Sequence, residues 1–144
     1  MVYEERNAWV GLVVSAAAIA AYIWFVVQQA GGGPLTDVDW VPPMLWTIGL
    51  GIAATIVISI LWGIAAGLRD PKGATASDIR DRDISRMGAR IEHAFITLAG
   101  IGVIVLCALG AHVFWIANAM FLGFGIATLI GGAARLIAYR RGLV

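Results

Sequence analysis

Four long apolar segments separated by short polar ones make up most of this 144-residue chain. They cover about residues 8–28, 44–68, 91–110 and 114–139, so each has close to or more than the ~20 residues with which a helix crosses ~30 Å of hydrocarbon. Hydrophobic residues make up 60% of the sequence, which leaves too little polar surface to enclose a water-soluble core. We therefore predict an all-α fold in which residues 1–144 form a single transmembrane domain, a bundle of four helices.

The connections between these segments carry the signals that end and start helices. Residues 29–43 form a loop that begins with three glycines and ends with Pro42 and Pro43, which suit a helix start. Only residues 111–113 separate the third and fourth spans, so these two form a tight antiparallel hairpin. Three tryptophans lie near loop 29–43 and the hairpin turn, on the same side of the membrane. They are expected to form an aromatic belt: Trp40, Trp46 and Trp115.

The remaining connection, residues 69–90, is polar and amphipathic. It opens with the turn sequence Arg-Asp-Pro-Lys-Gly, and a new helix is expected from about residue 78, where a capping side chain precedes residues of alternating charge. Ile84, Met87 and Ile91 share one face of that helix. We expect the helix to continue into the third span.

Positive charge predicts the topology. All ten Lys and Arg residues lie in three groups, at Arg6, over 69–90 and over 135–141, and none lies in loop 29–43 or the hairpin turn. Short basic loops are retained in the cytoplasm. With four spans, both termini and loop 69–90 are therefore cytoplasmic, and the predicted location is the inner (plasma) membrane, as a multi-pass protein.

Two spans carry small residues at every fourth position, which places them in a row along one helix face. Such rows allow close approach of helix backbones in lipid. They predict helix-packing surfaces, either within one protomer or between copies of a homo-oligomer. The residues are Gly51, Thr55, Ser59, Gly63 and Gly67 in the second span, and Ala119, Gly123, Ala127 and Gly131 in the fourth.

The basic surface is the candidate contact site. Its arginines would attract anionic lipid headgroups by roughly 1 kcal/mol each near the membrane, or bind a cytoplasmic partner. The charge segregation reports topology, so direct nucleic-acid binding is not expected. The residues are Arg80, Arg82, Arg86, Arg90, Arg140 and Arg141.

Polar residues near or within the spans are the candidate titratable or binding groups. Glu92 and His93 stand at the cytoplasmic end of the third span, and Arg135 enters the fourth span from the same side. An ion pair between Glu92 and Arg135 that fixes the hairpin is the simpler interpretation, and a titratable site is the alternative. Asn118, one turn into the fourth span, is expected to hydrogen-bond across helices.

Nothing in the sequence specifies a reaction or a cofactor. No Asp, Glu, Lys or Arg lies in the central part of any span, which argues against an ion-coupled antiporter with a membrane-embedded carboxylate. His93 and His112 are 19 residues apart, about 28 Å along a helix, so they cannot share a metal within one protomer. Cys107 has no partner for a disulfide or a metal site. We expect no enzyme activity, no cofactor and no metal.

Several local sequences resemble an uncharacterised family of small four-span bacterial inner-membrane proteins. They are the opening residues 3–9 (YEERNAW), residues 45–49 (LWTIG), residues 81–84 (DRDI) with Gly88 and Arg90, residues 114–119 (FWIANA) and residues 138–142 (AYRRG). The resemblance implies four spans and supplies no activity. Because some such proteins are encoded beside helix-turn-helix regulators, it also implies a tethering role for a regulator.

The sequence thus predicts a non-enzymatic membrane interaction or accessory protein with a basic cytoplasmic surface. The alternative is a small dimeric transporter or channel for a small or apolar solute, with a cavity lined by Asn118, Thr47, Thr55 and Ser59.

Overall fold

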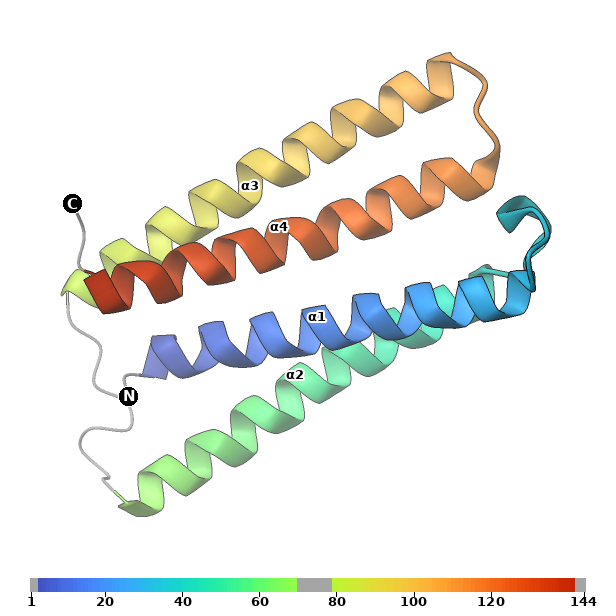
Figure 1. Ribbon diagram of the computed structural model, residues 1–144. Helices are drawn as coiled ribbons and strands as arrows, with labels where there is room; N and C mark the ends of the chain where they lie inside the picture. The colour runs from blue at the N-terminus through green and yellow to red at the C-terminus, as the bar shows by residue number, and fades with distance from the viewer. Residues whose placement is uncertain (1–2, 70–78, 142–144) are drawn as a thin grey trace.

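The computed structural model describes residues 3–69 and 79–141, which form four long α-helices and one short 3-10 helix (Figure 1). Each long helix is long and apolar enough to cross a membrane, so the prediction of an all-α chain with four candidate transmembrane helices is confirmed. The elements are α1 (Tyr3–Ala30), η1 (Leu35–Asp37), α2 (Val41–Arg69), α3 (Ile79–Ala108) and α4 (Val113–Arg141).

Glycine and proline set the ends of the helices. Gly31 and Gly32 follow α1 with φ of 54° and 89°, and Gly110 closes the α3–α4 turn with φ of 66°; a residue without Cβ adopts this left-handed backbone at little cost. Helix α2 begins at Val41, three residues before the predicted start. Pro42 and Pro43 fit there because the first turn of a helix has no use for their missing N–H groups.

The amphipathic stretch and the third span form one helix. α3 runs without interruption from Ile79 to Ala108, 30 residues, or about 45 Å. Residues 70–78 of the predicted loop 69–90 lie outside the described part of the chain.

The helices lie in a row in the order α3, α4, α1, α2 (Figure 1). α4 packs against α3 on one side and α1 on the other, α2 packs against α1, and within the described residues α2 and α3 have no extensive contact. The bundle is therefore open. We call the end with the starts of α1 and α3 and the ends of α2 and α4 the basic end, and the opposite end the turn end.

A small core closes the turn end. Tyr22, Val26, Val38, Met44 and Phe114 are buried together, joining α1, the loop after η1, α2 and α4. Trp40 lies partly buried against this core, with its ring centroid 6.1 Å from that of Phe114. Of the three tryptophans predicted to form a belt, only Trp46 and Trp115 are exposed.

Helix α4 packs between α3 and α1 because its small residues let both neighbouring helices approach. A Cβ on Gly123 would meet the Cβ of Ala99 in α3, and one on Gly125 would meet the Ile19 side chain in α1. Ala127, in the small-residue row of α4, has no exposed surface. The small-residue row of α4 therefore packs against other helices of the same chain.

The row on α2 has a different environment. Its five members are half-buried, but a Cβ added to Gly51, Gly63 or Gly67 would meet no heavy atom within 4 Å. The small residues of α2 are thus not covered by a close helix contact within the described residues.

Replacing Gly123 by Ala should destabilise the α3–α4 hairpin, because the Cβ of Ala99 belongs to the helix frame and cannot swing away. Overpacking of this kind costs about 1–3 kcal/mol, which an SDS or thermal unfolding titration in detergent would measure. Gly63→Ala is the matched control, since the added methyl group enters open space; equal destabilisation by both substitutions would contradict this account.

Candidate functional site

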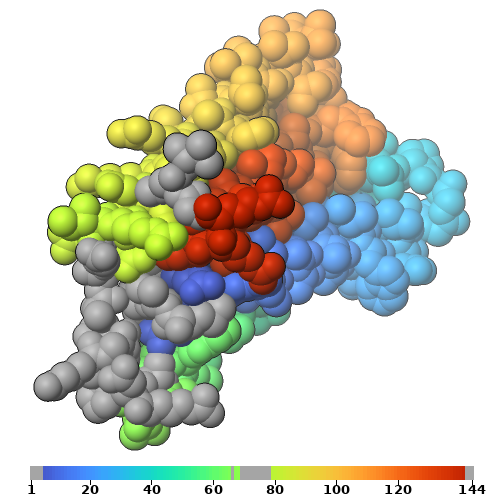
Figure 2. Space-filling model, turned by 60° about the vertical axis from the view of Figure 1, so that its left-hand side comes forward, coloured from blue at the N-terminus to red at the C-terminus, as the bar shows by residue number. Residues whose placement is uncertain are grey.

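Six exposed arginines gather at the basic end. Four lie at the start of α3 and two at the end of α4, and Figure 2 shows these segments side by side on one face of the molecule. Asp83 lies 3.7 Å from Arg86, but both side chains are more than half exposed, so this contact neutralises little charge. The six are Arg80, Arg82, Arg86, Arg90, Arg140 and Arg141.

Two other charged residues of the same end, Asp81 and Arg6, are buried. Asp81 is only 7% exposed and Arg6 only 4%, and both make interactions within the protein. Ile84, one turn after Asp81, is fully buried, so this face of α3 packs inward while the neighbouring arginines point outward. The Asp81 carboxylate is thus buried, whereas Asp83 remains exposed among the arginines.

Arg140 lies near an aromatic ring of a neighbouring helix. Its guanidinium carbon is 6.0 Å from the centroid of the Trp9 ring in α1, within the range of a cation–π interaction. Arg140 is exposed, so its N–H groups remain available to an anion. Arg140 thus places its charge near the Trp9 ring while its N–H groups remain exposed.

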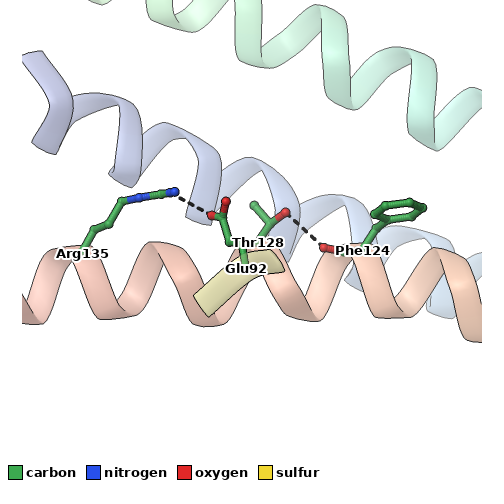
Figure 3. Close-up of polar contacts among 4 residues, drawn as sticks. All are labelled: Glu92, Phe124, Thr128 and Arg135. Carbon is green, nitrogen blue, oxygen red and sulfur yellow. Dashed lines mark hydrogen bonds and ion pairs between the residues drawn. The ribbon is translucent and has the colours of Figure 1, made fainter. Parts of the chain in front are cut away.

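A second charged pair lies deeper and joins α3 to α4. Arg135 Nη1 donates a hydrogen bond of 2.8 Å to Glu92 Oε1, and the side chains are 20% and 23% exposed (Figure 3). This is the pair expected across the hairpin.

Each member of this pair lies over a glycine of the facing helix. A Cβ on Gly88 of α3 would overlap the Arg135 side chain, and a Cβ on Gly131 of α4 would overlap that of Glu92. Gly131 of the α4 row thus makes room for a charged side chain rather than for a helix backbone. Arg135 Nε is buried without a hydrogen-bond partner, so Glu92 supplies the hydrogen bond that holds the guanidinium.

The histidines do not join this pair. His93, next to Glu92, is exposed. His112 lies in the α3–α4 turn, where its Nδ1 accepts a hydrogen bond from the Phe114 N–H at 3.2 Å. Among the described residues, no group of three or more His, Cys, Asp or Glu side chains is placed to hold a metal ion.

Asn118 is buried and forms hydrogen bonds with α1 and with its own helix. Tyr22 donates its hydroxyl to Asn118 Oδ1 at 2.7 Å, and Asn118 Nδ2 donates to the Phe114 carbonyl at 2.8 Å. The cross-helix hydrogen bond expected of Asn118 is therefore present, with Tyr22 as a partner that the apolar pattern of α1 concealed. Asn118 lines neither of the grooves described next.

The larger groove runs between α1, α2 and α4, with a volume of about 640 Å³; we call it the wide groove. Thr47 and Thr55 line it, as expected, together with Ser15 and Thr128, whereas Ser59 does not. Its three threonine hydroxyls donate to the carbonyl four residues earlier in their own helix, as Figure 3 shows for Thr128. The groove therefore presents a mainly apolar surface.

A smaller groove lies between α1 and α2 near the basic end, with a volume of about 310 Å³. We call it the tryptophan groove. Its lining is entirely apolar, and Trp9, the ring beneath Arg140, is one of its walls. The full lining is Trp9, Val10, Val13, Val14, Ile58 and Trp62.

Comparisons with known proteins add no identification: no protein-family model, no curated protein and no solved structure matches this sequence.

Removing one partner of the Glu92–Arg135 pair should cost more than removing both. Glu92→Met leaves the guanidinium without its hydrogen-bond acceptor, and we expect a loss of about 2 kcal/mol, below the ~3–5 kcal/mol of a fully buried pair because water reaches both side chains. In a double-mutant cycle with Arg135→Met, measured by unfolding in detergent, the double variant should be destabilised by less than the about 2 kcal/mol of Glu92→Met alone. Strict additivity would show that the pair does not stabilise the hairpin.

Proposed function

We propose that this chain is a non-enzymatic multi-pass protein of the bacterial inner membrane, with both termini in the cytoplasm, that acts by binding other molecules at its basic end. The observation that carries the proposal is the exposure of six arginines on one end, where Asp83 is also exposed but Asp81 is buried and Glu92 is paired. The positive-inside rule supports the orientation, since the turn end has no basic residue.

The partner that suits this surface is acidic. A cytoplasmic protein with a carboxylate-rich face, such as a regulator tethered to the membrane, would pair with the arginines of α3, and anionic headgroups offer the same attraction. The resemblance to small four-span proteins encoded beside regulators supports the first of these.

Self-association, or association with another membrane protein, completes the proposal. The small-residue row of α2 remains open above Gly51, Gly63 and Gly67, and α2 packs within the described chain mainly against α1. In lipid, such a row favours close contact with a further helix.

Changing Arg80, Arg82 and Arg86 together to Gln should release a protein partner without unfolding the helices, because all three side chains are exposed. At roughly 1 kcal/mol for each arginine, the affinity should fall about a hundredfold. The measurement is quantitative recovery of proteins cross-linked to the full chain in native membranes.

Lys at the same three positions is the control, because it keeps the charge and should preserve most of the recovery. Equal recovery with the wild-type and Gln variants would contradict the proposal, whereas loss of binding to phosphatidylglycerol vesicles alone would identify headgroups as the occupant of this surface.

The wide groove favours a second candidate, a small dimeric transporter or channel for a small or apolar solute. Its α2 wall extends from Met44 to Ile56, about 18 Å at 1.5 Å per residue, which is similar to half of a ~30 Å hydrocarbon layer. The threonine hydroxyls of the groove are hydrogen-bonded to carbonyls of their own helices, so the groove suits an apolar solute better than a hydrated ion.

If the groove conducts such a solute, filling it should stop the flux. Thr55→Phe places a ring in the groove and should abolish uptake of an apolar fluorescent probe by reconstituted vesicles. Ile60→Phe, at an exposed position of α2 outside both the lining and the small-residue row, should leave uptake within about twofold of wild type. Uptake that is insensitive to Thr55→Phe would eliminate this candidate.

A further inference from the structure

We infer that the tryptophan groove and Arg140 together form a binding site for one anionic phospholipid, with the phosphate on Arg140 and an acyl chain in the groove. The inference rests on the proposed membrane insertion of this chain. It goes beyond a general attraction of headgroups to the basic end, because it assigns both parts of the lipid to named residues.

The headgroup half of the site is Arg140, which lies beside the Trp9 ring. The guanidinium carbon is 6.0 Å from the ring centroid, so the cation–π attraction favours the side-chain orientation that puts the charge over this end of the groove. The planar N–H edge matches two phosphate oxygens at once. Arg141, which is also exposed, adds charge at the same helix end.

The acyl half of the site is the groove itself. All six lining residues are apolar, and the groove covers about 8 Å of α1 from Trp9 to Val14. Trp62 and Ile58 of α2 form the opposite wall and are each 39% exposed, so the groove opens to the surrounding lipid. An acyl chain that moves from lipid into the groove gains no hydrophobic free energy, because both environments are apolar. The favourable free energy comes from close van der Waals contact with the groove walls.

Charge complementarity selects the class of lipid. Trp9 belongs to both halves, because it lines the groove and lies under Arg140. A chain in the groove therefore brings its headgroup close to a positive charge at the helix end. A phosphatidylglycerol headgroup carries a net negative charge that satisfies this arginine, whereas a phosphatidylcholine headgroup carries its own cation.

The test is native mass spectrometry of the full chain in nanodiscs or detergent, supplied with phosphatidylglycerol or phosphatidylcholine of identical acyl chains. We expect one retained phosphatidylglycerol per chain, bound at least about tenfold more tightly than phosphatidylcholine. Arg140→Gln should remove about tenfold of affinity and most of this headgroup preference. Arg90→Gln removes an exposed arginine from α3, which does not flank the groove, and should cost no more than about twofold.

The groove half has its own variants. Ile58→Trp fills the groove and should displace the retained lipid while the helices remain folded, as judged by circular dichroism. Trp62→Ala should weaken binding of long-chain phosphatidylglycerol severalfold and of a short-chain analogue much less, whereas Trp46→Ala, at the other end of α2, should have no such chain-length effect.

Equal losses with Arg140→Gln and Arg90→Gln would overturn the site in favour of diffuse charge attraction. Retention of the lipid by Ile58→Trp would overturn the groove as its location. Partner capture by the α3 arginines is measured separately, so either that function or this lipid site can fail while the other stands.

Discussion

The arrangement of the helices depends on how closely α3 and α1 can approach α4. In a bilayer, hydrophobicity does not draw helices together, so contact has to come from shape and from polar groups that need partners. Helix α4 supplies both. Gly123 allows the Cβ of Ala99 to come close, Gly131 leaves the space in which the Glu92 side chain lies, and Arg135 then meets that carboxylate while lying over Gly88. A side chain at either glycine beneath the ion pair would displace one of the charges, so close packing and charge pairing are a single constraint.

The same reasoning explains why α2 is the least enclosed helix. It has no charged or amide side chain within its span that demands a partner on α4, and its threonines at 47 and 55 satisfy their hydroxyls within their own helix. Its contacts are with α1 and with the small core at the turn end, to which it contributes Met44. The two grooves beside the α1–α2 contact follow from this. In water such grooves would expose apolar surface at a cost of about 25 cal/mol for each Å², but in lipid the acyl chains fill them.

The number of helices could be predicted from the sequence, and their order in space could not. Apolar runs long enough to span a bilayer are unambiguous, and glycine, proline and charge place their ends within a few residues. Glu92 and Arg135 stand at similar depths on the two helices of one hairpin, which also predicts that they lie near each other. Apolar patterning gives no information about which face of a span contacts another helix, because lipid and protein interior select the same side chains. The partnership of Tyr22 with Asn118, the burial of Arg6 and Asp81, and the placement of Arg140 near Trp9 each depend on that missing information.

The two small-residue rows show why a spacing pattern is an incomplete guide to helix contacts. Both rows repeat every fourth residue, yet the α4 row lies against α3 and the α2 row is open above its glycines. The difference lies in what accompanies the small residues. Arg135, four residues after Gly131, has a guanidinium that needs a carboxylate, and the facing helix provides Glu92 at the same depth. The α2 row has no comparable group, so nothing within the chain fixes a partner for it. A small-residue row permits close approach, and a polar group that must be satisfied decides which helix approaches.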